Sequence, residues 1–417
     1  YLSNSYALSG LFPTADLFKE EFGRYMPAIN NAKDMNTHDL RVYLANFLDL
    51  RMKQFASREF MRMAAEVGKE GVTDDHFELV RDLYKETTDY EEIKIDNFEN
   101  LEDIYNFRKT QSLGLKTYVR EIDNIIGGLT KGTVNIIFGW TGSFKTTWAL
   151  NIAYNNAIKN KYNIAYISLE VPKLDIMFNL LSRHSFETQF DKFPFIPHDR
   201  IRKGLLTLEQ ERYLFDVVQP DLQRSEGKLV VLDETDFKTF GFAEIRVKLE
   251  ELDELLLEQT GYGLDAVVWD HANLFKFSGA GDRNKSQGDL INDYISFIRK
   301  LSIAFRKNKE TGEFSQLCNL VVAQCNRDGW KRAVKNSGRY ELTAISEANE
   351  IERAGYRIMS VFTNDDMKNT KEARVQLLKN RSGQTISEPV MMFVDPEAYV
   401  AGSDVEGFTN TSVGIGD

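Results

Sequence analysis

Hydrophobic residues recur with two different periods along the chain. Up to about residue 92 they follow the three- and four-residue spacing of amphipathic helices, as at Leu40, Tyr43, Leu44 and Phe47. No run of apolar residues in this part indicates a strand. The pattern therefore predicts an all-helical N-terminal domain over residues 1–92, which we interpret as an interaction domain without chemistry of its own.

After about residue 115, short continuous apolar runs alternate with helical patterns. The runs predict strands at 134–138, 163–169, 228–233, 264–270 and 319–324. The patterns between them predict helices at 145–159, 172–185, 207–218, 242–259 and 289–307. Buried strands that alternate with helices are typical of a parallel sheet whose two faces are both covered. We therefore predict an α/β domain with a mostly parallel sheet over residues 114–400.

The end of this domain has a different pattern. Apolar runs at 357–363, 374–380 and 390–395 follow one another without long helices, which indicates antiparallel strands at one edge of the sheet. Charged and Asn-rich residues at 93–113 predict a linker with one short helix. Gly-rich and polar residues at 401–417 predict a flexible acidic tail.

The composition excludes several classes of protein. The 417 residues contain no run of about 18 apolar residues, so we expect no membrane span. Cys318 and Cys325 lack the spacing of a zinc site, and two core thiols fit a cytoplasmic protein. The net charge of −11 argues against a protein that coats DNA with its whole surface. Any contact with nucleic acid must therefore use local clusters of basic residues.

The stretch GWTGSFKT at 139–146 has the length and the Lys-Thr ending of a phosphate-binding loop, and it lies between a predicted strand and a predicted helix. In such a loop, backbone N–H groups and the helix N-terminus bind phosphate oxygens. Lys145 would reach the β- and γ-phosphates of ATP, and the Thr146 hydroxyl would bind Mg²⁺. The predicted nucleotide-binding residues are Gly139, Thr141, Gly142, Ser143, Phe144, Lys145, Thr146 and Thr147.

Phe144 stands where the motif has a Gly, the residue that best tolerates unusual backbone dihedral angles. It therefore needs an ordinary conformation or strain of roughly 1–3 kcal/mol, or else Gly142 takes up the unusual conformation instead. The imperfect motif by itself leaves open whether this is a nucleotide site or a chance match.

Polar residues at the ends of three other predicted strands favour a nucleotide site. Asp270 ends one strand, where a carboxylate can hold Mg²⁺ together with Thr146. Glu170 ends another, where it can orient and polarise the attacking water, and Gln324 ends a third, where it can sense the γ-phosphate. Because ligands bind at the carboxyl ends of the strands in α/β sheets, we expect these residues to converge with Lys145.

A set of segments gives the chain a resemblance to a known family. They are LKTYVREIDNIIGGLTKG, the phosphate loop, NIAYISLEVP, PHDRIRKGLLT, LDAVVWDHANLF, VVAQCNRD, SEANEIERAGYRIM and LLKNRSGQ, in order from about 114 to 400. Together they resemble the DnaB-type replicative DNA helicases, which are RecA-like hexameric motors with a P-loop NTPase core. The resemblance implies a 5′–3′ helicase that uses ATP, or another NTP, with Mg²⁺. It also implies the cytoplasm of a bacterium or of an infected host, and the divergence fits a phage or plasmid origin.

The same resemblance implies an assembly. The N-terminal helices correspond to the family's collar, the linker packs on the neighbouring subunit, and a homo-hexameric ring holds ATP between subunits. Lys379 and Arg381 then reach into the neighbour's site and stabilise the transferring phosphoryl group. The alternative is that they are solvated charges of a surface turn. The implied partners are single-stranded DNA and a primase, a helicase loader or a single-strand-binding protein.

Two basic segments lie by the DNA channel in the resemblance. The first contributes Lys276, Arg283 and Lys285, and the second, the densest positive run, contributes Arg327, Lys331, Arg332, Lys335 and Arg339. Glu347 and Asn349 match positions where the family contacts the DNA backbone. Such contacts neutralise phosphates and read few bases, although most charged runs are simply solvated surface. Trp330, within the second segment, either stacks on a base or packs inside the protein.

Three departures from the family's pattern stand out. Phe144 replaces a Gly, and His271 follows Asp270 where a Tyr is more usual. His271 either senses phosphate or has no role. The residues EANE at 347–350 replace a Gly-containing ESGS, so the details of DNA contact do not carry over.

Two other functions fit the same core. A RecA-like recombination protein or regulatory ATPase would hydrolyse ATP without unwinding DNA, and a scaffold would bind nucleotide or DNA without hydrolysis. The helical domain followed by a linker favours the helicase over the first. The presence of Lys145, Glu170 and Arg381 counts against the second.

Overall fold

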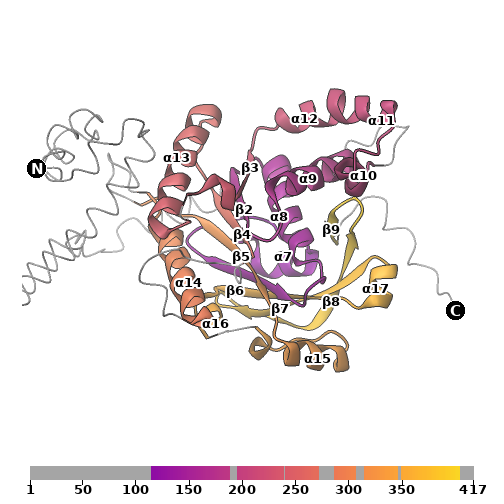
Figure 1. The fold of residues 1–417 in the computed structure, drawn as a ribbon. Helices are drawn as coiled ribbons and strands as arrows, with labels where there is room; N and C mark the ends of the chain where they lie inside the picture. The colour runs from indigo at the N-terminus through magenta and orange to yellow at the C-terminus, as the bar shows by residue number, and fades with distance from the viewer. Residues whose placement is uncertain are drawn as a thin grey trace, which may run out of the picture. The chain divides into compact units, whose positions relative to one another are not determined.

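A mixed sheet of nine strands forms the centre of the part of the chain that the computed structural model describes, namely residues 114–187, 195–238, 240–271, 286–306, 314–345 and 349–403. Its strands lie in the order β3-β2-β4-β5-β1-β6-β7-β8-β9 (Figure 1). The parallel strands are β3 (Leu229–Asp233), β2 (Ile164–Ser168), β4 (Ala266–Asp270), β5 (Cys318–Gln324), β1 (Val134–Gly139) and β6 (Arg357–Phe362). The antiparallel strands that follow are β7 (Glu372–Asn380), β8 (Ile386–Asp395) and β9 (Val400–Gly402). The predicted α/β fold and its antiparallel edge are confirmed.

Helices cover both faces of the parallel strands. On one face lie α8 (Lys145–Asn160) and α9 (Lys173–Glu187), and on the other lie α13 (Phe242–Thr260) and α14 (Gln287–Ile303). Alternate residues of a strand serve the two faces: in β4, Val268 packs on the side of α8 and Trp269 on the side of α14. Burial of each such large apolar side chain contributes about 1.5–3 kcal/mol. The continuous apolar runs of the sequence therefore reflect strands that are buried on both sides.

Shorter helices occupy the connections. They are α7 (Arg120–Ile126), α10 (His198–Arg202), α11 (Leu208–Tyr213), η1 (Leu214–Val218), α12 (Gln219–Gln223), η2 (Glu234–Asp236), α15 (Arg327–Lys335), η4 (Leu342–Ala344), α16 (Asn349–Ala354) and α17 (Asp365–Asn369). One predicted helix differs from the structure. The helix expected over 207–218 is α11, followed by the π-helical turn η1 and then α12. Pro220 lies in the first turn of α12, where its missing N–H interrupts the regular α-helical hydrogen-bond pattern.

Several predictions concern residues outside this part of the chain. The N-terminal domain (1–92) and the linker (93–113) lie outside the described residues. The segment predicted as a tail from residue 401 begins differently, because Ala401 and Gly402 belong to β9 and pair with β8. The residues after Ser403 lie outside the described part as well.

The remaining general expectations concern the membrane and the cysteines. Within the described residues, we find no helix that is both long enough and apolar enough to cross a membrane. Cys318 and Cys325 are buried and form no disulfide bond, as expected of core thiols.

Candidate functional site

The predicted phosphate loop connects the end of β1 to the start of α8, at the carboxyl edge of the sheet. It runs from Gly139 through Trp140 to Thr147, and its predicted nucleotide-binding residues are Gly139, Thr141, Gly142, Ser143, Phe144, Lys145, Thr146 and Thr147. Gly139 is required by close packing, because a Cβ atom there would lie 2.3 Å from the Val361 carbonyl oxygen and 2.6 Å from Ser143 Oγ. The strand–loop–helix order is the setting in which such a loop binds phosphate.

Phe144 has the conformation for which the motif normally uses a Gly. Its φ is 67° and its ψ is 22°, in the left-handed region, and Gly142 is also left-handed with φ of 72°. Gly142 therefore does not relieve Phe144. A left-handed conformation costs a residue with a Cβ roughly 1–2 kcal/mol. The half-buried Phe144 ring packs against the core on the side of α8, which offsets part of this cost.

Lys145 is the first residue of α8 and is buried within the loop. Its Nζ donates a hydrogen bond of 2.9 Å to the Trp140 carbonyl. Burial lowers the pKa of the ammonium group, while the nearby carboxylates of Glu170 and Asp270 raise it. The two acids therefore favour the charged form of Lys145 in a buried position.

Asp270, at the end of β4, is fully buried and has two hydrogen-bond donors. Thr146 Oγ1 donates to its Oδ1 at 3.2 Å, and the Tyr166 hydroxyl on β2 donates to its Oδ2 at 2.6 Å. Burial raises the pKa of Asp270 to about 6, and both hydrogen bonds act in the opposite direction. The two donors therefore help to keep a buried carboxyl group ionised.

The predicted metal ligands, Thr146 and Asp270, lie in direct contact and offer hydroxyl and carboxylate oxygens. These are the ligands that Mg²⁺ prefers, usually one or two protein groups together with substrate phosphates. No group of three or more His, Cys, Asp or Glu side chains that could hold a metal is found among the described residues. The donor set thus fits a Mg²⁺ ion that is shared with a nucleotide.

Glu170 and Gln324 complete the same edge of the sheet. The register pairs Ser168 with Asp270, and the Leu169 N–H donates to the Asp270 carbonyl, so the exposed Glu170 follows directly beside Asp270. Gln324, at the end of β5, is in register with Gly139 of the loop. The structure therefore brings together the strand-end residues that the sequence predicted to converge.

His271 is buried immediately after Asp270. Within the described residues, neither nitrogen of its ring has a hydrogen-bond partner. Burial, and to a lesser degree the positive charge of Lys145, lowers the pKa of His271 to about 4. The ring is therefore neutral at physiological pH and lies within electrostatic range of the phosphate loop.

Lys379 and Arg381 lie at the end of β7 and in the turn between β7 and β8, two of the antiparallel strands that the sequence predicted. Lys379 Nζ donates to the Glu352 carbonyl at 2.5 Å, and the Arg381 guanidinium donates to the Arg353 carbonyl. Both therefore contact α16 of their own chain. In the described part of the chain, neither residue hydrogen-bonds the phosphate loop.

The second basic segment begins with the helix α15, which Asn326 caps through a 2.7 Å bond from the Gly329 N–H. Its exposed cations are Arg327, Lys331, Arg332, Lys335 and Arg339. Three of them have acidic neighbours: Lys331 has Asp328 at 3.8 Å, Arg332 has Glu341 at 3.9 Å, and Arg339 pairs with Glu388.

Lys276, Arg283, Lys285 and Glu347 lie outside the described residues, and Asn349 is the first residue of α16.

Trp330 packs within the protein. Its ring stacks on that of Trp140, the second residue of the phosphate loop, with centroids 5.1 Å apart and an interplanar angle of 22°. Of the two interpretations from sequence, packing is the one that the structure supports.

Sequence reasoning missed Tyr166 and the partner of Trp330. A signal for Tyr166 was available, because a tyrosine in a strand buried on both faces needs a partner for its hydroxyl group. The stack between Trp140 and Trp330 had no comparable signal.

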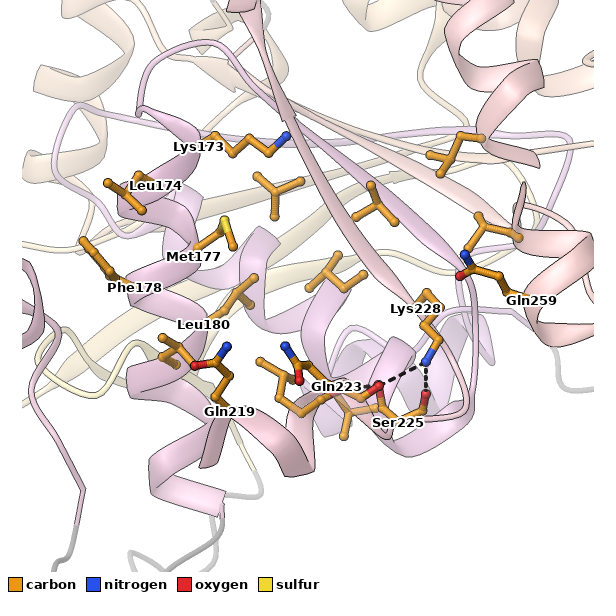
Figure 2. Close-up of a pocket in the computed structure, with 18 of the residues that line it drawn as sticks. Lys173, Leu174, Met177, Phe178, Leu180, Gln219, Gln223, Ser225, Lys228 and Gln259 are labelled. Carbon is orange, nitrogen blue, oxygen red and sulfur yellow. Dashed lines mark hydrogen bonds between the residues drawn. The ribbon is translucent and has the colours of Figure 1, made fainter. Parts of the chain in front are cut away.

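A cavity of about 720 Å³ lies away from the phosphate loop, between α9, α12, β3 and α13 (Figure 2). Its walls are mainly apolar, with Leu174, Met177 and Phe178 from α9, and polar groups such as Lys228 and Gln219 stand at its margin. The Lys228 ammonium donates to the Ser225 carbonyl at 2.6 Å. None of the predicted site residues lines this cavity, and its chemistry does not suit phosphate.

Comparisons with known proteins identify the family of this chain. A model of the DnaB-like helicase C-terminal domain matches residues 114–397. The chain is 23% identical to the replicative DNA helicase DnaC of Bacillus subtilis (strain 168), over 70% of this chain and 67% of that protein. It is 22% identical to the replicative DNA helicase DnaB of Geobacillus stearothermophilus, over 78% of this chain and 68% of that protein.

Two solved structures share the fold. One is described as an ATPase domain, and it aligns with a TM-score of 0.58 at 16% identity, over 75% of this chain and 100% of that one. A DnaB-like replicative helicase, described with its interactions with primase, aligns with a TM-score of 0.56 at 15% identity, over 96% of this chain and 87% of that one. The described sheet and its helices thus have the RecA-like fold of these proteins.

The hydrogen bond from Tyr166 to Asp270 leads to a test. Tyr166→Phe removes a donor that lowers the pKa of Asp270, so that pKa should rise above about 6 and less of the carboxylate should be present near neutral pH. We expect Mg²⁺-dependent ATP binding to weaken by about 3- to 10-fold, and the deficit to shrink at alkaline pH, where the carboxyl group ionises again. Titration of a fluorescent ATP analogue against Mg²⁺ at two pH values measures this.

The matched control is Tyr294→Phe, which removes the hydroxyl of another fully buried tyrosine, one that lies on α14. If Tyr166→Phe has the same Mg²⁺ dependence as this control, Tyr166 does not position Asp270.

Proposed function

This chain belongs to the DnaB-like helicase family, and from that premise we propose that it is an ATP-dependent ring helicase that moves along single-stranded DNA and unwinds duplex DNA during replication. The observation that carries the proposal is the convergence of the phosphate loop with Glu170, Asp270 and Gln324 at one edge of the sheet. A hydrolysing motor needs a phosphate cradle, metal ligands, a carboxylate for water and a sensor of the γ-phosphate.

We assign ATP binding to the loop residues 139–147. Their backbone N–H groups and the N-terminus of α8 bind phosphate oxygens, and Lys145 exchanges its bond to the Trp140 carbonyl for the β- and γ-phosphates. Thr146 and Asp270 would hold Mg²⁺, which neutralises phosphate charge when bound. The hydrogen bond between these two side chains supports this assignment, because it already places both oxygens together.

Hydrolysis is assigned to Glu170, which orients and polarises the attacking water. Its exposed position directly beside Asp270 supports this role. Gln324 senses the γ-phosphate, and its register with Gly139 supports that role. His271 is a further candidate for contact with phosphate, since a buried ring whose two nitrogens lack partners within the described residues lies within electrostatic range of Lys145.

Lys379 and Arg381 complete the site of a neighbouring subunit in a homo-hexamer. The turn between two paired strands is a rigid place from which to project cations at a transferring phosphoryl group. Their present partners are backbone carbonyls of α16, and neither ion-pairs with an acid of its own chain within the described residues. Both cations can therefore exchange these contacts for phosphate oxygens.

Single-stranded DNA is assigned to the exposed cations of α15 and Arg339, and, on the sequence alone, to Lys276, Arg283, Lys285, Glu347 and Asn349. We further propose movement in the 5′–3′ direction and a location in the cytoplasm. A helicase loader and a single-strand-binding protein are proposed partners. Primase is another, since a structural relative is described with its interactions with primase.

ATP hydrolysis by the purified protein, with and without single-stranded DNA, tests the function. We expect DNA to stimulate hydrolysis, and Lys145→Ala to lower it by about 10²-fold or more. Lys159→Ala, at the exposed far end of the same helix, is the matched control and should keep the activity. A hydrolysis rate that single-stranded DNA does not change would favour a recombination or regulatory ATPase. An intact oligomer that does not hydrolyse ATP would favour a scaffold.

Arg381→Ala tests action between subunits. We expect nucleotide affinity to remain, while turnover falls by about 10³-fold because charge in the transition state is no longer stabilised. Mixing this variant with Lys145→Ala should restore part of the activity, since some sites then combine an intact Lys145 with an intact Arg381 from the neighbour. Normal hydrolysis by Arg381→Ala alone, or no recovery in mixed oligomers, would contradict the role in trans.

Neutralising Lys331, Arg332 and Lys335 to Gln tests the DNA surface. We expect weaker binding to single-stranded DNA and a log–log salt slope lower by up to about 2, because fewer counterions are released. The same change at Lys159, Lys161 and Lys203 alters the net charge equally at exposed positions outside α15. Equal affinities of the two triple variants, measured by fluorescence anisotropy, would place the DNA site elsewhere.

A further inference from the structure

The stack of Trp140 on Trp330 joins two parts of the proposed motor. Trp140 lies in the phosphate loop, and Trp330 lies in the middle of the basic helix α15. Both rings are partly buried and pack against the core on the side of α14. The stack is therefore a direct contact between the nucleotide loop and the element to which we assign DNA.

A second contact joins the loop to the end of the same segment. Tyr340 follows α15 and its turn, and its hydroxyl accepts a weak hydrogen bond of 3.7 Å from the Cys325 thiol. The backbone N–H of Cys325 in turn donates to the carbonyl of Gly139, the first residue of the loop, at 3.1 Å. The Tyr340 ring packs edge-to-face on Phe138 of β1 with centroids 5.3 Å apart. The segment from Trp330 to Tyr340 is thus held against the loop at both of its ends.

α15 itself is tightly anchored to its surroundings. A Cβ atom on Gly329 would lie 2.4 Å from the Ala344 Cβ, so the helix sits directly on the turn η4. Asn326 caps the helix and also donates to the Thr343 carbonyl at 3.0 Å. Because α15 packs this closely on η4, we expect a displacement of the Trp140 ring to move α15 as a rigid body.

The loop end of this path is linked to the phosphate-binding lysine. Lys145 Nζ donates to the carbonyl of Trp140, and this bond is exchanged if Lys145 turns to a bound phosphate. The environment of Trp140 therefore changes with the state of the nucleotide site. The contacts that could couple the two sites therefore lead from Lys145 through Trp140 to Trp330 and the cations of α15.

We propose that Trp330 is a positioning residue whose stack on Trp140 couples nucleotide binding to binding of single-stranded DNA. The proposal rests on the function proposed above, and it adds a link that the hydrolytic residues do not need. Coupling is reciprocal, so ATP tightens DNA binding by the same factor by which DNA tightens ATP binding. An aromatic pair of this kind corresponds to a factor of about 3- to 10-fold.

The experiment measures the affinity of the full-length oligomer for fluorescein-labelled oligo-dT, with and without the non-hydrolysable analogue AMP-PNP. In wild type we expect AMP-PNP to tighten DNA binding. In Trp330→Leu the ratio of the two affinities should fall toward one, while AMP-PNP affinity without DNA stays within about two-fold of wild type. Trp330→Phe should keep most of the ratio, because a ring can still stack. Trp140→Leu should lose it, and the double variant should lose no more than either single variant.

Tryptophan emission gives a second readout that a merely structural role would not change. Trp148 and Trp269 are fully buried in the core, away from solvent, whereas the stacked pair is only partly buried. AMP-PNP should therefore alter the emission of wild type through the stacked pair. In Trp330→Leu the change should differ from that of wild type, because Trp140 then responds to the nucleotide without its stacking partner. Circular dichroism and thermal melting establish that each variant is folded.

The possible outcomes distinguish a failure of the proposed coupling through Trp330 from a failure of the proposed helicase function. A wild-type ratio in a folded Trp330→Leu would overturn the proposal, as would a loss of DNA affinity that leaves the ratio intact, because Trp330 would then contact DNA itself. Wild type that binds DNA regardless of AMP-PNP would also overturn the link, while leaving DNA binding in place. Wild type that binds no DNA would instead contradict the proposed function.

Discussion

Backbone hydrogen bonds between β2, β4, β5 and β1 hold these parallel strands in register, and the rest of the candidate site depends on that register. Ser168 lies opposite Asp270, and Gly139 lies opposite Gln324, so the last residue of each strand reaches the same edge of the sheet. A slip of one residue in any strand would turn its terminal side chain to the other face. Helices on both faces then fix the strands by burying every second side chain on either side.

Ionisable side chains are buried at the same edge of the sheet, where burial disfavours their charged forms. Asp270 is fully buried, and a buried carboxyl group tends to take up a proton unless donors and cations favour its charge. Thr146, Tyr166 and Lys145 all favour the ionised form of Asp270. Asp270 and Glu170 in turn favour the charged form of Lys145. Each charged group is therefore stabilised by the others, and a low local dielectric constant strengthens the attraction between them.

Much of this arrangement was predictable from the sequence. The strand ends, the loop between β1 and α8, and the convergence of Glu170, Asp270 and Gln324 follow from apolar runs and from the geometry of parallel sheets. Such local patterns predict strands because a strand that is buried on both faces needs apolar residues at nearly every position.

What could not be predicted involves contacts between residues far apart in the sequence. Tyr166 meets Asp270 across 104 residues, and no spacing rule gives that pair. The stack of Trp140 on Trp330 depends on how α15 packs under the phosphate loop. The left-handed conformation of Phe144 was one of several alternatives, because the sequence states which residue is unusual but not how the backbone responds. The contacts that we propose between Arg381 and a second subunit involve atoms outside this chain.

The two cysteine thiols have low reactivity in the folded protein. Cys318 and Cys325 are the only cysteines in the sequence, and both are buried. Burial raises the pKa of Cys318 to about 12 and raises that of Cys325 as well. Because the thiolate is the reactive form, neither is a ready target for maleimides or oxidants in the folded protein. A single cysteine placed at an exposed position of α15, such as Lys335, would therefore take a dye selectively, so that movements of this helix can be followed by fluorescence without replacing any native thiol.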